Sequence, residues 1–193
     1  MIKIKNCALF GGTFDPFHNG HLHLIKSLIA SKKFDQFVVI PAGDPYQKSS
    51  IASGEERFSM AKLALAAEDV ELSDCEIRRT GPSYALDTIR EIKSLYPAER
   101  YTWIMGSDAF VGLPTWNRFE ELSKAINFLV VKRPGSMEPQ PIPGVESEVI
   151  EIGALDISST SIRNHLKNGG DAGDFLPNSV ASFIKERGLY GAA

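Results

Sequence analysis

Residues 11–21 read Gly11-Gly12-Thr13-Phe14-Asp15-Pro16-Phe17-His18-Asn19-Gly20-His21 and separate an expected strand from an expected helix. The apolar residues Cys7–Phe10 before them are typical of a buried parallel strand, and an amphipathic helix is predicted to begin near Gly20. A glycine turn at this place binds phosphate in α/β proteins, because backbone N–H groups and the helix dipole point at one spot. This turn also carries two imidazoles, His18 and His21, at the helix entrance. We therefore predict an anion site after the first strand.

Other glycine-rich phosphate loops do not fit this sequence. The chain has no Gly-x-x-x-x-Gly-Lys-Ser/Thr string, and the spacing of Gly11, Gly12 and Gly20 does not match Gly-x-Gly-x-x-Gly. A histidine pair can also indicate zinc, but a zinc site usually has three or four protein ligands. We predict no metal-ligating residues, because two imidazoles that donate hydrogen bonds to a phosphate agree better with the glycine turn. The four histidines of the chain are His18, His21, His23 and His165.

The composition is that of an ordinary globular protein, with 43% hydrophobic and 23% charged residues. A length of 193 residues allows one substantial core, so we expect a single domain over residues 1–193. The formal net charge of −3 argues against a nucleic-acid partner, because such binders neutralise many phosphates. Any nucleotide that binds is therefore expected to be small and held locally.

The cysteines and the apolar segments predict where the protein is found. Cys7 and Cys75 indicate reduced thiols in the cytoplasm and no disulfide framework. Residues 1–5 have no long apolar segment, so they do not read as a signal peptide. No segment approaches the ~18 consecutive apolar residues that span a bilayer. We expect a cytoplasmic protein without a membrane partner.

Strand-like and helix-like segments alternate along the rest of the chain. Long apolar strands between helices suit a parallel sheet that is covered on both faces. The predicted fold class is α/β, a single doubly wound Rossmann-like domain with a parallel sheet. The expected elements are strands at 37–40, 101–105, 126–131 and 149–152, and helices from Gly20, from Gly54, and over about 83–96, 159–167 and 177–187.

Two of these helices carry more detailed predictions. The helix after Gly54 is expected to bury a face with Phe58, Ala61 and Leu65. Ser83 is expected to act as the N-cap of its helix, because serine is favoured at that position.

Two rare motifs carry a resemblance to a known family. Residues 11–21 resemble the signature of the HxGH nucleotidylyltransferase superfamily, and most closely that of bacterial nicotinate-nucleotide adenylyltransferases. Ile157–Arg163 resembles the Ser-Ser-Thr-x-Ile-Arg motif near the family's C-terminus. The resemblance extends from Phe10 to Tyr190. Further matches are Gly81-Pro82-Ser83-Tyr84, Asp87-Thr88, Gly106-Ser107-Asp108-Ala109, Trp116 and Lys132-Arg133-Pro134-Gly135.

The resemblance implies an ATP-dependent enzyme of NAD biosynthesis. Such an enzyme moves AMP from ATP to nicotinate mononucleotide, giving nicotinate adenine dinucleotide and pyrophosphate. His18 and His21 would bind the α- and β-phosphates, and Lys48 would contact the triphosphate. Mg²⁺ would arrive with ATP, because the sequence shows no carboxylate cage for it. This chain has Tyr46-Gln47 where many relatives have Pro-His before the lysine, which leaves the pose of this loop open.

The remaining site residues follow from the same resemblance. Asp108 would accept the ribose hydroxyls, although its position also suits a helix N-cap. Ser159 and Thr160 could likewise be N-caps, but hydroxyls at a helix start also bind anions. The expected ATP-binding residues are Gly11, Gly12, Thr13, Phe14, Asp108, Ser159, Thr160 and Arg163.

The pyridine nucleotide is expected to bind at two further segments. Trp116 would stack on the pyridine, or else anchor the core. The N–H groups at Ser83, Tyr84 and Ala85 would bind the nicotinate carboxylate. Relatives commonly have threonine at the position of Ala85, so a hydroxyl contact is absent here.

Several alternatives stay open at this point. The acceptor could be nicotinamide mononucleotide or phosphopantetheine, and a cytidylyltransferase would share the HxGH loop. A nucleotide-sensing module without turnover is a second class, but it has no need of the donors at His18 and His21. The sequence also leaves open whether the chain forms a homo-oligomer.

Overall fold

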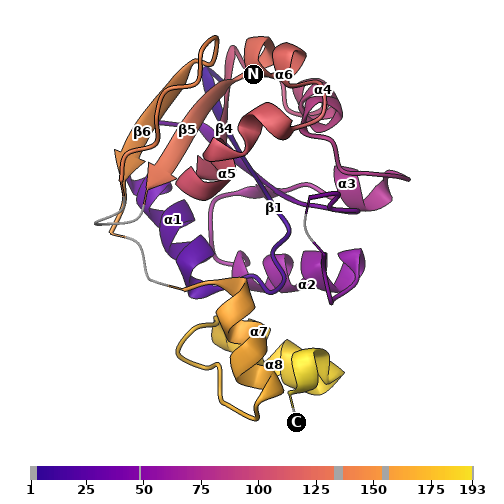
Figure 1. Ribbon diagram of the computed structural model, residues 1–193. Coiled ribbons are helices and arrows are strands. Elements are labelled where there is room, and N and C mark those ends of the chain that lie inside the picture. Colours follow the sequence, from indigo (N-terminus) through magenta and orange to yellow (C-terminus); the bar gives the residue numbers. More distant parts are fainter. Residues whose placement is uncertain (1–3, 48, 133–136, 154–156, 193) are drawn as a thin grey trace.

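One parallel sheet organises the chain, whose computed structural model describes residues 4–47, 49–132, 137–153 and 157–192. In these residues six strands form the sheet in the order β3-β2-β1-β4-β5-β6, with helices on both faces (Figure 1). The doubly wound α/β prediction is therefore confirmed. The strands are β1 (Asn6–Gly12), β2 (Gln36–Pro41), β3 (Glu71–Leu72), β4 (Arg100–Gly106), β5 (Asn127–Lys132) and β6 (Ser147–Glu151).

Helices fill the connections between most of these strands, as right-handed crossovers of parallel sheets require. The connection from β5 to β6 differs, because its described part, residues 137–146, contains no helix. The α-helices are α1 (Asn19–Ala30), α2 (Gly54–Ala64), α3 (Cys75–Arg78), α4 (Ala85–Leu95), α5 (Ser107–Val111), α6 (Phe119–Ala125), α7 (Ser159–Lys167) and α8 (Asn178–Arg187). Two short 3-10 helices are η1 (Leu113–Thr115) and η2 (Leu189–Gly191).

Successive residues of β1 belong to two hydrophobic cores on opposite faces of the sheet. Ala8 and Phe10 pack into the core that includes α1, α2, α7 and α8. Cys7 and Leu9 pack into the core that includes α4, α5 and α6. This alternation follows from the two-residue period of a strand. Both faces are buried, which explains why the strand reads as a continuous apolar run.

Two local predictions are wrong in detail. Of the predicted face, Ala61 and Leu65 are buried as expected, whereas Phe58 is only half-buried and Arg57 is fully buried. The helix is therefore turned so that an arginine faces inward. The N-cap of α4 is Tyr84 instead of Ser83, and no side chain caps this helix. The reason for both differences lies in the loops that these residues contact.

The strand order reverses direction between β1 and β4. From β1 the chain proceeds to β2 and β3 on one side, and from β4 to β5 and β6 on the other. Open α/β sheets bind ligands at the carboxyl ends of the strands beside such a reversal. The HxGH loop follows β1 and Asp108 follows β4. Figure 1 shows α7 and α8 together at one end of the molecule, beyond α1 and α2 and next to the C-terminus.

Candidate active site

His18 and His21 form a reciprocal pair at the start of α1. Nδ1 of His18 accepts a hydrogen bond from the His21 amide at 3.4 Å, and Nδ1 of His21 accepts one from the His18 amide at 3.2 Å. The two rings are stacked with centroids 3.6 Å apart. Because each Nδ1 accepts, the neutral rings are assigned their proton on Nε2. Both histidines thus offer an Nε2–H donor at a helix N-terminus, where the dipole favours an anion.

Buried aromatic rings and a glycine hold the histidines in place. The Phe14 ring meets the His21 ring edge-on at 5.0 Å, and Phe17 lies 5.2 Å from it. Phe14 was predicted to bind ATP, but its side chain is 3% exposed and packs in the core beside His21. A Cβ on Gly20 would lie 3.0 Å from Nδ1 of His18. Any larger residue between the two histidines would therefore press on the ring that caps the helix.

Gly11 and Gly12 lie between aromatic rings on opposite faces of the sheet. A Cβ on Gly11 would lie 2.4 Å from the Trp103 ring, whereas a Cβ on Gly12 would lie 2.8 Å from the Phe14 ring. Trp103 and Phe14 belong to different hydrophobic cores. Side chains at these two positions would collide with both rings, so glycine is required at the end of β1.

The buried carboxylate of Asp15 joins the HxGH loop to two distant segments. Its Oδ2 accepts from the Ile51 amide at 2.8 Å, and its Oδ1 accepts from the Ala52 amide at 3.1 Å and the Tyr190 hydroxyl at 2.7 Å. Asp15 is 2% exposed. Burial and the nearby Asp15 carboxylate raise the pKa of Tyr190, so the phenol keeps the proton that it donates. The loop after β2 and the C-terminal turn are thus fixed to the HxGH loop.

Arg57 explains why α2 turns a charged residue inward. Its guanidinium donates to the carbonyls of Thr13 at 2.7 Å, Gly43 at 3.0 Å and Ala52 at 3.2 Å. The residue is fully buried. Burial lowers the pKa of Arg57, and the Asp15 carboxylate opposes this shift. A buried charge persists when it is hydrogen-bonded, and here the guanidinium joins the HxGH loop to both ends of the loop after β2.

The start of α7 is capped by Ser158. Its hydroxyl accepts from the Ser161 amide, and the Ser161 side chain bonds back to the Ser158 amide. Ser159 and Thr160 therefore lie in the first turn of the helix, and neither is its N-cap. Their hydroxyls remain available for other contacts.

The C-terminal motif contacts the backbone of the HxGH loop. The Ser159 hydroxyl donates to the Pro16 carbonyl at 3.1 Å. The Arg163 guanidinium donates to the Asp15 carbonyl at 2.7 Å and to the Thr160 hydroxyl at 3.3 Å. The two motifs that are far apart in the sequence are thus in direct contact. We call His18, His21, Ser159, Thr160 and Arg163 the histidine side of the site.

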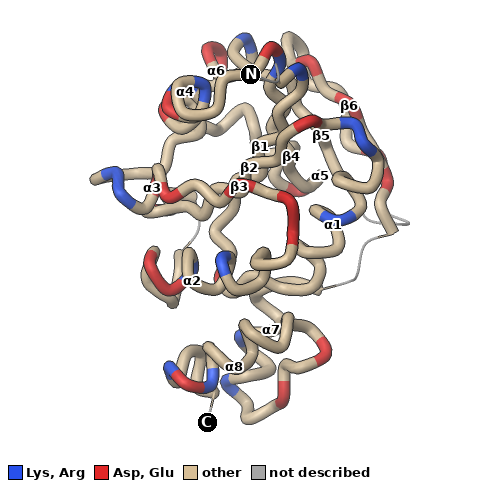
Figure 2. Tube along the Cα trace, turned by 180° about the vertical axis from the view of Figure 1, so that it is seen from behind, with Lys and Arg blue, Asp and Glu red and all other residues tan. Residues whose placement is uncertain are grey.

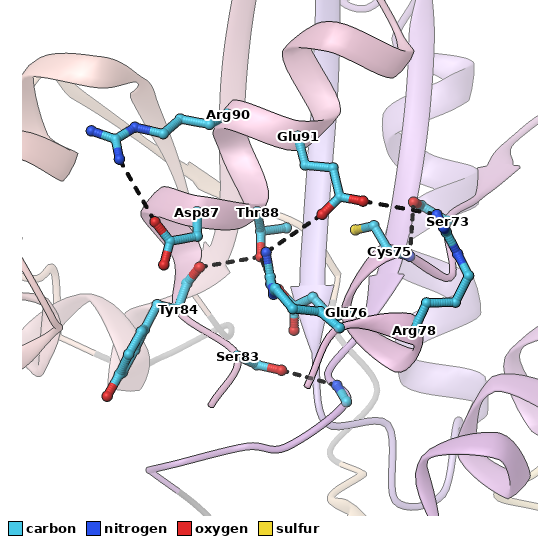
Figure 3. Close-up of polar contacts among 12 residues, drawn as sticks. Ser73, Cys75, Glu76, Arg78, Ser83, Tyr84, Asp87, Thr88, Arg90 and Glu91 are labelled. Atoms are coloured by element: carbon cyan, nitrogen blue, oxygen red, sulfur yellow. Dashed lines mark hydrogen bonds and ion pairs between the residues drawn. The ribbon is translucent and has the colours of Figure 1, made fainter. Parts of the chain in front are cut away.

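Ser83 belongs to a second polar network (Figure 3). Its hydroxyl accepts from the Gly43 amide at 3.0 Å and the Asp44 amide at 3.1 Å. Glu76 is 5% exposed and accepts from the Thr88 hydroxyl. Burial raises the pKa of Glu76. The predicted N-cap role of Ser83 fails because this hydroxyl bonds the loop after β2.

Close packing explains one glycine in that loop. A Cβ on Gly43 would lie 2.0 Å from the carbonyl oxygen of Glu76. The loop and α3 can therefore approach this closely only if residue 43 has no side chain. At this residue the Gly43 amide donates to the Ser83 hydroxyl, and the Gly43 carbonyl accepts from the Arg57 guanidinium.

Three aromatic side chains from separate segments gather beside this network. Tyr84 points away from Glu76 and Thr88 in Figure 3, and its ring meets Tyr46 edge-on with centroids 4.9 Å apart. The Tyr46 hydroxyl accepts from the Asn117 amide at 3.1 Å. Trp116, directly before Asn117, is half-buried. We call Tyr46, Tyr84 and Trp116 the aromatic side of the site.

Trp116 is partly an anchor, as one of the two sequence interpretations expects. Its ring stands edge-on to the buried Trp103 at 6.4 Å. The rest of the side chain remains accessible, so packing and stacking on a ligand are compatible. Trp103 in turn lies next to Gly11, so the Trp116 ring is connected through Trp103 to the end of β1.

The other predicted residues lie at the same edge of the sheet or outside the described residues. Ala85 begins α4, and Asp108 is exposed in the first turn of α5, directly after β4. Gly106 is the N-cap of α5, so the capping interpretation of Asp108 is wrong. Lys48 lies outside the described residues.

Two arginine side chains, those of Arg57 and Arg163, bring positive charge to the HxGH loop. Figure 2, seen from behind relative to Figure 1, shows Lys and Arg positions interspersed with Asp and Glu positions along the chain. Within the described ranges, no group of three or more His, Cys, Asp and Glu is arranged to hold a metal ion. No described helix is both long enough and apolar enough to span a membrane.

Comparison with known proteins assigns the family. A family model described as cytidylyltransferase-like matches residues 9–165. A Neisseria meningitidis protein named probable nicotinate-nucleotide adenylyltransferase is 36% identical over 97% of this chain and 99% of its own. The chain belongs to the nicotinate-nucleotide adenylyltransferase family. A Geobacillus thermodenitrificans protein of the same name is also 36% identical, over 96% of this chain and 86% of its own.

Solved structures support the fold of this nicotinate-nucleotide adenylyltransferase family member. A Plasmodium falciparum nicotinic acid mononucleotide adenylyltransferase, solved in complex with NaAD, matches with a TM-score of 0.84. The two chains are 20% identical, and the match covers 98% of each. At that identity the likeness establishes the shared fold.

Three residues of this family member were not singled out from the sequence. Arg57, Tyr190 and Glu76 are buried polar residues that hold the loops of the site. Arg57 looks like an exposed charge on a helix with acidic neighbours. Tyr190 lies 175 residues from Asp15, so no local pattern indicates their contact. Only the tertiary structure reveals these roles.

Proposed function

We propose that the chain transfers AMP from ATP to nicotinate mononucleotide. An oxygen of the acceptor 5′-phosphate forms a bond to the α-phosphorus of ATP. The bond from that phosphorus to the bridging oxygen breaks, and pyrophosphate leaves. The products are nicotinate adenine dinucleotide and pyrophosphate, as expected in NAD biosynthesis. Family membership over the whole chain supports this reaction class.

The reciprocal pair of His18 and His21 is the observation that carries the proposal. Phosphoryl and nucleotidyl transfer need positioning and charge stabilisation more than covalent chemistry. Two Nε2–H donors held by backbone bonds are already oriented before substrate arrives. Such donors stabilise negative charge that develops on the α- and β-phosphate oxygens. We therefore assign transition-state stabilisation to these two histidines.

The rest of the histidine side is proposed to hold the triphosphate. The start of α7 with Ser159, Thr160 and Arg163 contacts the HxGH loop, so two helix N-termini converge there. Arg163 is half-buried and can form charge-assisted bonds to phosphate. Gly11 and Gly12 have no side chains, which lets the end of β1 pack against the Trp103 and Phe14 rings. Asp108 and Lys48 complete the proposed set for the ribose and the triphosphate.

No residue of the chain is required to attack phosphorus. Burial raises the pKa of Cys7 to about 12 and also raises that of Cys75, so both thiols stay protonated at neutral pH. We propose that Mg²⁺ reaches the site bound to ATP, where it neutralises phosphate charge. The triphosphate itself supplies oxygen ligands for it.

Two further proposals concern the chain as a whole. Residues 1–193 are proposed to form one nucleotidylyltransferase domain, because every described strand belongs to the same sheet. The cytosol is the proposed location, because Cys7 and Cys75 are both free thiols.

Pyrophosphate release tests the proposed reaction. The purified chain is given ATP and Mg²⁺ with nicotinate mononucleotide, nicotinamide mononucleotide, phosphopantetheine or no acceptor. We expect the highest kcat/KM with the nicotinate substrate and no release without an acceptor. Faster turnover with nicotinamide mononucleotide would support the transfer of AMP but contradict nicotinate mononucleotide as the preferred acceptor. No turnover with any acceptor would favour a nucleotide-sensing module.

A further inference from the structure

We propose that Tyr46 is a binding residue for the pyridine ring of the acceptor, which it encloses together with Tyr84 and Trp116. The inference deepens the proposed function and rests on it, because it concerns the acceptor of that reaction. Tyr46 was set apart in the sequence only as a departure from the family motif, and no role followed from that.

The first argument is that two separate segments hold the Tyr46 side chain. Its ring meets the ring of Tyr84, the N-cap of α4, at an interplanar angle of 70°. Its hydroxyl accepts the amide proton of Asn117, the residue after Trp116. Tyr46 is therefore fixed between the two segments expected to bind the pyridine nucleotide. Although Tyr46 lies on an exposed loop, the residue is only 41% exposed, because these contacts cover the rest of it.

The second argument comes from the anchoring of the loop. The Ser83 hydroxyl accepts from the amides of Gly43 and Asp44, and the Asp44 carbonyl accepts from the Ser83 amide at 2.8 Å. These contacts fix the chain two residues before Tyr46. The position of the ring therefore rests on an anchored segment directly before it.

The third argument is the chemistry of the ligand. The pyridine of a mononucleotide is bonded to ribose through its ring nitrogen, so it is a flat cation. Aromatic faces attract such cations, and Tyr46, Tyr84 and Trp116 supply three rings. The Tyr46 oxygen already accepts from Asn117, so its own proton is left to donate. A carboxylate on the pyridine would accept it as a charge-assisted bond.

The residue type matters at this position, because tyrosine supplies both an aromatic face, which meets Tyr84, and a hydroxyl, which bonds Asn117. Replacing Tyr46 should weaken the binding of the acceptor and leave the binding of ATP unchanged.

Steady-state kinetics of Tyr46→Ala and Tyr46→Phe test the proposal. For Tyr46→Ala we expect KM for nicotinate mononucleotide to rise about tenfold, with KM for ATP and kcat within about twofold. Tyr46→Phe keeps the ring and loses the bond to Asn117, so its KM should rise about threefold. Ile51→Ala is the matched control, because Ile51 lies on the same loop with its side chain 67% exposed. Its KM values should stay native.

Three results would overturn the proposal. One is an unchanged KM for nicotinate mononucleotide in Tyr46→Ala. Another is an equal rise of both KM values, and the third is an equal effect of Ile51→Ala. A native chain that makes no dinucleotide would instead overturn the proposed function.

A binding measurement without turnover distinguishes failure of the Tyr46 proposal from failure of the proposed reaction. Nicotinate mononucleotide alone is titrated against tryptophan fluorescence, because Trp116 lies beside the proposed subsite. We expect a Kd about tenfold weaker for Tyr46→Ala than for the native chain. An equal Kd for the two chains would overturn the role of Tyr46, whatever the reaction is.

Discussion

The histidine side and the aromatic side of the site are built in different ways. On the histidine side, buried ions fix the backbone: Asp15 and Arg57 are almost inaccessible and bond five backbone groups between them. On the aromatic side, the rings of Tyr46 and Trp116 are partly exposed. Tyr46 meets Tyr84 edge-on and accepts one bond from Asn117, while Trp116 meets Trp103 edge-on. The first side is preorganised, and the second can adapt to a ring.

The difference teaches how the site divides its work. Charge stabilisation depends on donors that do not move, so a buried and fully bonded support suits phosphate chemistry. Recognition of a flat ring depends on area and faces, which half-exposed aromatic side chains supply. Changes on the histidine side should therefore reduce kcat or stability, and changes on the aromatic side should raise KM for the acceptor.

Removing the buried arginine should have the largest effect. Arg57→Met leaves three buried carbonyls without their charged donor and removes a positive charge near Asp15, so we expect the free energy of unfolding to fall by about 3–5 kcal/mol. Urea denaturation measures this loss. Arg90→Met is the control, because the ion pairs of Arg90 with Asp87 and Glu121 are exposed and should contribute less than about 1 kcal/mol. Similar losses in both variants would contradict the special role of the buried ion.

Removing one histidine should have the next largest effect. His18→Ala deletes an Nε2–H donor and the N-cap of α1, and we expect kcat to fall about 10²–10³-fold. Initial rates with saturating ATP and nicotinate mononucleotide give the value. His23→Ala, on the same helix, should retain native kcat. A His18→Ala enzyme with native kcat and raised KM would show that His18 contributes to substrate binding and does not stabilise the transition state.

Removing the C-terminal phenol should have a moderate effect on stability. Tyr190→Phe leaves the Asp15 carboxylate two of its three donors, so we expect a loss of about 1.5–3 kcal/mol, the range for bonds to charged groups. Thermal unfolding measures it. The matched control is Tyr101→Phe, whose hydroxyl bonds only the backbone of Tyr96 and Ala98 and should cost about 1 kcal/mol. A smaller loss in Tyr190→Phe than in Tyr101→Phe would contradict the role of Asp15.

The smallest expected effect appears as a pH dependence. Because burial raises the pKa of Glu76, the folded chain holds this proton where the unfolded chain has released it. The contribution to stability is therefore present below the usual value of 4.5 and is lost as the pH rises through the raised pKa. We expect Glu76→Gln to gain stability relative to the native chain between pH 4 and pH 7, as measured by urea denaturation at several pH values. A pH-independent difference would contradict the raised pKa.

The sequence predicts the elements that local signals determine. Glycine spacing and the histidines indicate the HxGH loop, and α7 spans the predicted residues because a capping box begins it. The N-cap prediction for Ser83 was wrong, because local preference cannot show that Gly43 and Asp44 approach its hydroxyl. These two hydrogen bonds to a distant loop take the place of the expected bond to the start of α4.

Long-range polar contacts are what the sequence could not predict. The bond from Tyr190 to Asp15 and the inward turn of Arg57 depend on the packing of distant loops. The histidine side was therefore predicted in its donors and missed in its supports. On the aromatic side, the sequence singles out Trp116 and Tyr84 as candidates but does not indicate the bond between Tyr46 and Asn117, which are 71 residues apart.

Stereochemistry at phosphorus tests most directly that the protein transfers AMP in a single displacement. The Sp diastereomer of adenosine 5′-O-(1-thiotriphosphate) is converted with nicotinate mononucleotide, and the configuration at the α-phosphorus of the dinucleotide is determined. One in-line displacement, aligned by His18 and His21, predicts inversion. Retention would show two displacements with AMP bound to the enzyme in between, and it would contradict a site that only positions the two substrates.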